Sequence, residues 1–163
     1  MLRNEIKENS LFTQVQDLIA PMGYKVVDVQ KRETPGGVEL YLTVFLADRD
    51  VTTDDLAEVY NIVYPRYQVI FGRRDLTLEV SSPGMQRNFK DVYEFTLFKG
   101  KLVKVYSSAY SSNIEGTISD ADDNGVTLTS AVVQDTGEGF ETLSLSYDEI
   151  QKAKLTYRWE EKK

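Results

Sequence analysis

The chain of 163 residues contains neither cysteine nor histidine. Without cysteine there is no disulfide, thiolate metal site or cysteine nucleophile, which fits a reducing cytoplasm. Without histidine there is no Ser-His-Asp triad and no imidazole-ligated metal. No apolar run approaches the roughly 20 residues that span a bilayer, and the first residues lack the apolar core of a signal peptide. We therefore expect a soluble intracellular protein without a membrane segment, and we assign no metal or cofactor.

Basic charge is also scarce, with 19 Lys and Arg against 26 Asp and Glu and a net charge of -7. Residues 1–84 carry a net charge of -4 and residues 85–163 carry -3. Proteins that bind naked nucleic acid through their overall field have the opposite balance. The composition favours a binding module whose partner is part of a nucleoprotein particle, especially a basic protein.

The first third of the chain has a mixed helix and strand pattern. Apolar residues at helical spacing predict a helix over residues 11–22, with Ser10 as its N-cap. Residues 24–32 and 38–46 are typical of strands, and the second of them alternates apolar and polar residues without interruption. The Thr-Pro-Gly-Gly turn at residues 34–37 predicts that these two strands pair as a hairpin.

A second helix is expected to begin at Thr52 or Thr53 and to end or kink at Pro65. Residues 76–80 then alternate as a third strand. The order helix, strand, strand, helix, strand predicts an α/β layer domain with its helices on one face of the sheet.

After residues 81–84 (Ser-Ser-Pro-Gly) the pattern changes to short strands, which places a domain boundary between residues 84 and 85. The expected elements are a short helix over residues 91–97, strands over residues 102–106, 114–120, 126–129, 142–146 and 153–158, and a mobile loop over residues 132–141. Five short strands suggest a small barrel, and Gly116 would let one strand bend sharply. The fold class is therefore α+β, with an α/β domain over residues 1–84 and an all-β barrel over residues 85–163.

Residues 120–125 match the opening of a calcium-binding EF-hand loop. Such a loop needs a bidentate Glu at its twelfth position, which is Ala131 here. The favoured interpretation is a hairpin turn in which Asn124 and Gly125 adopt positive φ values. Paired carboxylates elsewhere are explained by helix starts, turns and tails, so no catalytic residue is assigned.

A local basic patch is possible in the second half, formed by Lys99, Lys101, Lys104, Lys154 and Arg158, with Lys152 nearby. These residues either form a solvated surface or contact phosphate despite the acidic total. Tyr106, Tyr110 and Tyr157 could stack on bases, although tyrosines at strand edges more often pack against neighbouring side chains.

The segment 76–84 (LTLEVSSPG), followed by Met85 and Arg87, closely resembles the signature of the ribosome maturation factor RimP family. Further similarity covers residues 23–29, 51–55, 95–105, 114–118 and 150–153, which is nearly the whole chain. The chain departs from the family pattern at residues 65–74, which lack an acidic, proline-rich approach to the third strand. It also departs at Asn88, where proline is usual.

This resemblance implies an amino-terminal α/β domain and a carboxy-terminal Sm-like barrel in a cytoplasmic protein without enzymatic activity. It implies action on the free small (30S) ribosomal subunit, with ribosomal RNA and ribosomal protein number twelve as partners. We expect a monomer. The interdomain linker and possible partner contact comprise Ser81, Ser82, Pro83, Gly84 and Arg87, with Pro83 keeping Ser82 extended.

Two other functions remain open at this point. One is an Sm-like RNA-binding regulator that acts as a ring. The other is a carboxylate-dependent enzyme with Asp54, Asp55 or Asp122 as candidate groups, which lacks a convergent set of polar residues to support it.

Overall fold

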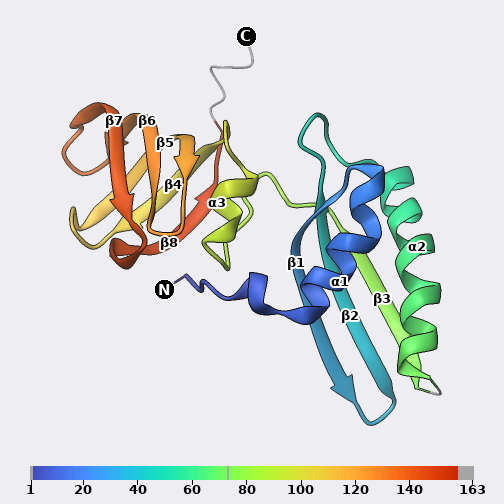
Figure 1. Ribbon diagram of the computed structural model, residues 1–163. Coiled ribbons are helices and arrows are strands. Elements are labelled where there is room, and N and C mark those ends of the chain that lie inside the picture. Colours follow the sequence, from blue (N-terminus) through green and yellow to red (C-terminus); the bar gives the residue numbers. More distant parts are fainter. Residues whose placement is uncertain (1, 73, 158–163) are drawn as a thin grey trace. The chain divides into compact units, whose positions relative to one another are not determined.

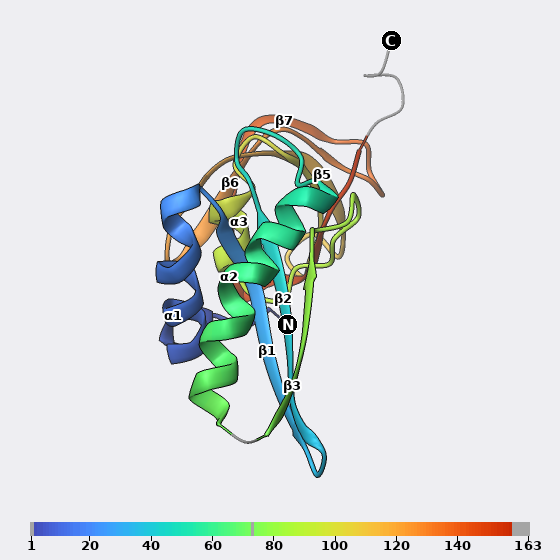
Figure 2. The same ribbon diagram turned by 90° about the vertical axis from the view of Figure 1, so that its right-hand side faces the viewer.

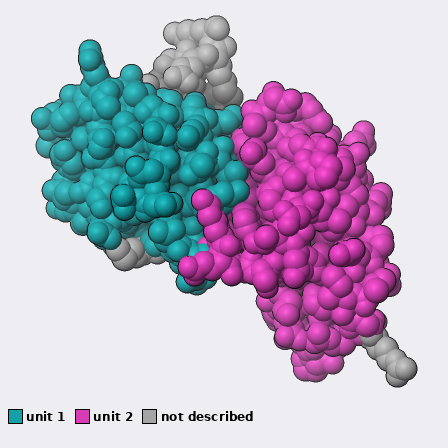
Figure 3. Space-filling view, in the orientation of Figure 1, with its two compact units in different colours: residues 1–5, 84–163 teal, residues 6–83 magenta. Residues whose placement is uncertain are grey.

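The computed structural model describes residues 2–72 and 74–157, in two compact units (Figure 1). Residues 6–83 form one unit, and residues 1–5 together with residues 84–163 form the other, as coloured in Figure 3. The chain is mixed α+β. Within the described residues, no helix is long and apolar enough to cross a membrane. Independent folding of residues 1–84 and 85–163 stays a prediction.

The unit of residues 6–83 contains a three-stranded sheet. Its elements are η1 (Ile6–Glu8), α1 (Ser10–Ile19), η2 (Ala20–Met22), β1 (Lys25–Thr34), β2 (Gly37–Phe45), α2 (Thr53–Phe71) and β3 (Asp75–Ser81). The strand order is β1-β2-β3, with β1 and β2 antiparallel and β2 and β3 parallel. The hairpin predicted from the turn at residues 34–37 is confirmed, and α2 forms the crossover between the two parallel strands.

The core of this unit lies between the sheet and its two long helices. Helix α1 contacts β1 and α2, while α2 contacts β3, and Figure 2 shows both helices on the same side of the sheet. The alternation predicted for the second strand is confirmed, because every second side chain from Val38 to Leu46 is buried. Each such Val or Leu contributes about 1.5–3 kcal/mol when fully buried.

Two helix ends differ from the sequence-based expectation. Ser10 is not the N-cap of α1: the Asn9 side chain accepts hydrogen bonds from the backbone N–H of Leu11 (2.9 Å) and of Phe12 (3.4 Å). Pro65 does not end α2, which continues to Phe71. Proline removes one intrahelical hydrogen bond, and this loss is tolerated because Pro65 lies on the exposed side of the helix, where water can reach the backbone.

The other unit is built around a five-stranded antiparallel sheet. Its elements are α3 (Tyr93–Leu97), β4 (Leu102–Ser107), β5 (Ser112–Ala121), β6 (Gly125–Val133), β7 (Gly139–Ser146), η3 (Tyr147–Glu149) and β8 (Ile150–Leu155). The strand order is β7-β6-β5-β4-β8, so the last strand lies beside the first. No pairing joins β7 to β8 in the part of the chain that the structure describes.

The outer edge of β8 is occupied by the chain that leads into α3. Phe89 donates its backbone N–H to the Ala153 carbonyl (2.8 Å), and Leu155 donates to the Arg87 carbonyl (2.9 Å). Asn88 and Lys154 form a bridge between these two bonds. This edge of the sheet is therefore closed by the unit's own chain.

Gly116 lies at a point where β5 closely approaches β6. The register between these strands shifts around Gly116, and Ser130 on β6 has φ 51°. A Cβ atom on Gly116 would lie 3.1 Å from Leu128 Cβ and 3.3 Å from Ala131 Cβ. The glycine thus permits a close approach of two strands at an irregular point in the sheet.

Two loops differ from the prediction. The loop expected over residues 132–141 is shorter, since β6 runs to Val133 and β7 begins at Gly139. In the β5–β6 turn, neither Asn124 nor Gly125 has a positive φ. The Asp122 Oδ1 atom instead accepts hydrogen bonds from the backbone N–H groups of these residues, at 2.7 and 3.0 Å. The side chain, rather than left-handed backbone, therefore closes the turn.

The first residues of the chain bind to the segment before α3. Arg3 donates its backbone N–H to the Lys90 carbonyl (3.1 Å) and accepts from Val92 N–H (2.8 Å). Glu5 donates its N–H to the buried carboxylate of Asp91 at 2.9 Å. The chain consequently passes between the two units twice, near residues 5–6 and near residues 83–84.

Candidate functional site

The register of β4 and β8 brings basic side chains together. Lys104 is opposite Lys154, and Tyr106 is opposite Lys152. Opposite residues of an antiparallel pair project from the same face, and Val103, Val105 and Ala153 between them are buried. The outward residues Lys104, Lys152, Lys154 and Tyr106 therefore share one surface, which we call the β4–β8 face.

The β4–β8 face concentrates positive charge in an acidic protein. In the described part of the chain, no ion pair involves Lys104, Lys152 or Lys154. Lys104 is paired with Lys154 on one side and with Glu115 of β5 on the other, so Glu115 is the acidic neighbour of Lys104 across the sheet. Like charges directly opposite each other destabilise a sheet, so the pairing of Lys104 with Lys154 has an energetic cost.

The other members of the predicted basic patch are placed differently. Lys99 forms an ion pair with Asp120 (Nζ–Oδ1 3.1 Å), and this lysine holds the pKa of the Asp120 carboxyl below its usual value. Lys101 is exposed but precedes β4 and has no partner in the β4–β8 register. Arg158 lies outside the described residues. Lys99 is therefore neutralised locally, whereas Lys104 and Lys154 are brought side by side.

The expected linker is an exposed stretch between the two units. Ser81 ends β3, and its hydroxyl lies 3.5 Å from that of Thr43. Ser82 and Gly84 are exposed, and Pro83 is half-buried. Gly84 does not adopt a positive φ, and a Cβ atom there would meet nothing within 4 Å. The stiffness of this stretch therefore depends on Pro83 rather than on special backbone angles at Gly84.

Arg87 lies inside the second unit. Its guanidinium donates to Glu94 through Nε (2.9 Å) and Nη2 (3.2 Å), and the two side chains are 12% and 1% exposed. The Glu94 carboxylate also accepts from Lys90 N–H (2.8 Å) and Asp91 N–H (3.3 Å). This bidentate pair orders the segment that leads into α3. A contact of Arg87 with a partner stays a prediction.

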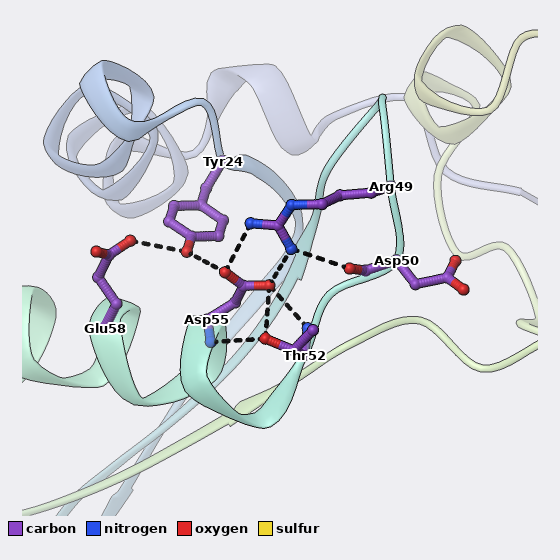
Figure 4. A network of polar contacts seen from close by, with 6 residues as sticks. All are labelled: Tyr24, Arg49, Asp50, Thr52, Asp55 and Glu58. Atoms are coloured by element: carbon purple, nitrogen blue, oxygen red, sulfur yellow. Dashed lines mark hydrogen bonds and ion pairs between the residues drawn. The ribbon is translucent and has the colours of Figure 1, made fainter.

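A network of polar side chains surrounds the amino end of α2 (Figure 4). Asp55 accepts from Arg49 through both terminal nitrogens, Nη1 at 2.5 Å and Nη2 at 2.9 Å. It also accepts from the Thr52 backbone N–H (2.8 Å), the Thr52 hydroxyl (2.9 Å) and the Tyr24 hydroxyl (2.9 Å). The Arg49 guanidinium, followed by the Thr52 N–H, holds the pKa of the Asp55 carboxyl well below its usual range.

Tyr24 links this network to the start of β1. Its hydroxyl also lies 2.8 Å from Glu58 Oε1, and burial followed by the Glu58 and Asp55 carboxylates raises the pKa of Tyr24. Asp55 is thus a fixed anion whose oxygens are occupied, so it is poorly suited to accept a proton in catalysis. The network fastens the β2–α2 loop to the helix that follows it.

The other two candidate carboxylates, both in the described part of the chain, have ordinary surroundings. Asp54 is exposed, and Asp122 closes a turn in the other unit. No group of His, Cys, Asp or Glu that could hold a metal ion occurs among the described residues. From the sequence, Asp55 was expected in the first turn of a helix and was one of three candidate carboxylates for an enzyme. The Thr-x-x-Asp spacing could have indicated the capping box, but no local pattern indicates Tyr24 or Arg49.

A family model of the RimP N-terminal domain matches residues 14–86. A protein of Borrelia turicatae (strain 91E135) named ribosome maturation factor RimP is 22% identical over 153 residues, which are 93% of this chain and 97% of the relative. A protein of the same name from Borrelia recurrentis (strain A1) is 20% identical, covering 93% of this chain and 99% of the relative.

Residues 14–86 match the RimP N-terminal domain family, and the chain is similar to proteins named RimP over nearly its whole length.

The match to the RimP N-terminal domain includes most of α1, the whole sheet of the first unit and the network around Asp55. The β4–β8 face lies beyond it. Among solved structures, a novel Sm-like archaeal protein from Pyrobaculum aerophilum is 25% identical over 41% of this chain, with a TM-score of 0.37. The aligned region spans about half (52%) of that solved chain, and a likeness at this TM-score assigns no fold.

Proposed function

We propose that this chain is a non-enzymatic assembly factor that binds the free small (30S) ribosomal subunit in the cytoplasm. The observation that carries the proposal is the match over 93% of the chain to relatives named ribosome maturation factor. In this role the protein aids incorporation of a ribosomal protein, number twelve, and contacts that protein and ribosomal RNA as a monomer.

The state of the carboxylates supports a role without catalysis. Asp55 is held as an anion by five hydrogen bonds, two of them from Arg49, and Asp122 closes a hairpin turn. A general acid or base needs a proton that it can exchange near neutral pH, together with a nearby reacting group. Neither residue offers this arrangement.

We propose in addition that the second unit has an Sm-like barrel fold. A short helix, α3, precedes five consecutive antiparallel strands, and the last strand, β8, pairs with the first, β4. This order of elements supports the proposal.

The alternative is an Sm-like RNA-binding regulator that acts as a ring. A ring built by strand pairing needs a free edge on each side of every copy. The outer edge of β8 is already hydrogen-bonded to Arg87 and Phe89 of the same chain. A second copy would have to displace this segment and the buried Arg87–Glu94 pair with it, so the structure favours the monomeric factor.

Co-sedimentation with purified small subunits, large subunits and complete ribosomes tests the proposed function. We expect the protein to pellet with small subunits alone. Equal retention on large subunits, or no retention on small ones, would contradict the proposal. Sedimentation equilibrium of the free protein provides the control, because a ring would give a mass several times that of the 18.6 kDa chain.

A further inference from the structure

We propose that the β4–β8 face, formed by Lys104, Lys152, Lys154 and Tyr106, is a binding surface for the sugar-phosphate backbone of RNA. The identity of that RNA as small-subunit ribosomal RNA rests on the proposed function. The affinity of the face for RNA rests on its own geometry and charge.

The strand register places the three lysines within reach of one short stretch of backbone. Lys104 and Lys154 are direct partners on neighbouring strands, and Lys152 is two residues from Lys154 on the same face. Neighbouring strands are about 4.8 Å apart, and alternate residues of a strand are about 6.7 Å apart. The three ammonium groups can therefore contact a few consecutive phosphates at once.

Charge identifies the kind of partner. Lys104 and Lys154 are half-buried, so their carbon stems lie on the sheet while the ammonium groups extend outward. The two charges repel each other, and no ion pair neutralises either of them in the described part of the chain. A bound anion relieves this repulsion, whereas a basic protein would increase it. Phosphate is thus the chemistry that this face recognises.

Tyr106 gives the face an aromatic element beside the charges. Its side chain is 37% exposed although its strand is paired on both sides, and it is the direct partner of Lys152. A base of single-stranded RNA can stack on an exposed ring while lysines hold the adjacent phosphates. Such stacking tolerates any base sequence, so the face is expected to bind without a strong sequence preference.

The experiment compares two double variants of the 163-residue chain. Lys104→Gln/Lys154→Gln removes the opposed pair. Lys25→Gln/Arg66→Gln removes the same charge from exposed basic residues elsewhere and serves as the matched control. For each variant we would measure binding to protein-free small-subunit RNA, and separately to intact small subunits, at salt concentrations between about 50 and 200 mM.

We expect the opposed-pair variant to bind RNA more weakly and with a shallower salt dependence. Each phosphate contact contributes about one unit to the slope of log affinity against log salt, so the slope should fall by about two. The advantage of the wild-type chain over this variant should then shrink about tenfold between 50 and 200 mM salt. The control variant should keep the wild-type slope.

Tyr106→Leu separates stacking from charge. Stacking releases no counterions, so this variant should lose affinity by the same factor at every salt concentration. Melting temperatures close to that of the wild-type chain would establish that all the variants are folded.

Unchanged RNA affinity and slope in the opposed-pair variant, or an equal loss in the control variant, would overturn the proposal. The outcome is separable from that for the proposed function. If the wild-type chain pellets with small subunits and the opposed-pair variant pellets equally well at every salt concentration, the assembly role stands and the RNA-binding face is wrong. If RNA binding depends on the face but no protein pellets with small subunits, the reverse holds.

Discussion

Asp55 is a candidate catalytic carboxylate in the sequence, but in the folded protein both of its oxygens accept hydrogen bonds. The five hydrogen bonds that its carboxylate accepts come from Tyr24, Arg49 and Thr52. Of these three residues, only Thr52 belongs to a capping box that the sequence spacing could indicate. The unfolded chain lacks the Arg49 and Tyr24 contacts. The folded state therefore favours the ionised carboxylate more strongly than the unfolded state does.

This difference predicts how stability depends on pH. Because the pKa of Asp55 is lowered on folding, the unfolded state binds the extra proton and stability falls as pH drops below about 4, the pKa of an unperturbed Asp. Above that pH the stabilisation is complete. We expect Asp55→Asn to be less stable than wild type at pH 7, and the gap to narrow as the pH falls below about 4. Denaturant unfolding at several pH values measures this.

Asp54→Asn is the matched control, because Asp54 is an exposed residue in the same helical turn. It should leave the pH dependence close to that of wild type. A constant gap between wild type and Asp55→Asn from pH 7 down to pH 2 would contradict a linked titration at Asp55.

The buried pair of Arg87 and Glu94 leads to a second prediction at this scale. Glu94→Gln removes the charge that compensates Arg87, and breaking a buried ion pair costs about 3–5 kcal/mol. The variant should lose about that much unfolding free energy in urea. The double variant Arg87→Met/Glu94→Leu should recover a large part of the loss, since it leaves no buried charge unpaired. A Glu94→Gln protein as stable as wild type would show that the pair is dispensable.

At the scale of single elements, sequence periodicity predicted the strands and their buried faces, but it missed features that depend on contacts with distant parts of the chain. The alternation over residues 38–46 predicted β2 and its buried face, because a period of two is a local property. Pro65 was expected to end or kink α2, and the helix continues past it to Phe71. Whether a helix continues through proline depends on the exposure of the preceding turn, which tertiary packing sets. Isolated lysines in the sequence became a surface only through the pairing of β4 with β8.

The contact between β5 and β6 supplies a prediction for an element. Gly116→Ala adds a Cβ atom 3.1 Å from Leu128 Cβ and 3.3 Å from Ala131 Cβ, which is closer than such atoms normally approach. Separation of the strands or a shift of Leu128 should cost about 1–3 kcal/mol. Thermal unfolding followed by circular dichroism should show the lower melting temperature.

Gly84→Ala is the control for this change, because a Cβ atom at Gly84 meets nothing within 4 Å and its φ is not positive. It should be neutral or slightly stabilising, since alanine restricts the unfolded chain more than glycine does. Equal melting temperatures for Gly116→Ala and wild type would mean that the sheet adjusts without cost.

For the whole molecule, the two chain passages between the units matter most. The sequence pattern revealed one of them, the Ser-Ser-Pro-Gly stretch, because it separates a mixed helix and strand pattern from a pattern of short strands. The other depends on Arg3 and Glu5, which bind Lys90, Asp91 and Val92 through backbone groups. Backbone hydrogen bonds between segments so far apart leave no trace in composition or spacing, so residues 1–5 were assigned to the first domain.

This second passage changes what is expected of the linker. If the orientation of the units matters for small-subunit binding, replacing Pro83-Gly84 by a longer Gly-Ser run widens the range of orientations in the free protein. The docked residues 3–5 still restrict that range, so the linker variant alone should bind only slightly more weakly. Deleting residues 2–5 in the same variant removes the second restriction. A tenfold smaller competent fraction then weakens the apparent affinity about tenfold.

Three variants decide the matter: the flexible linker, the deletion of residues 2–5, and their combination. Single-molecule energy transfer between one dye in each unit reports the spread of distances, and co-sedimentation reports small-subunit binding. The combined variant should show the widest spread of distances. Its affinity loss should exceed the product of the two single losses, because either passage alone still restricts the motion of the units when the other is loosened. Melting curves must show both units folded. If the combined variant has a demonstrably wider spread and still binds like the wild-type chain, the passages connect the units without orienting them for function.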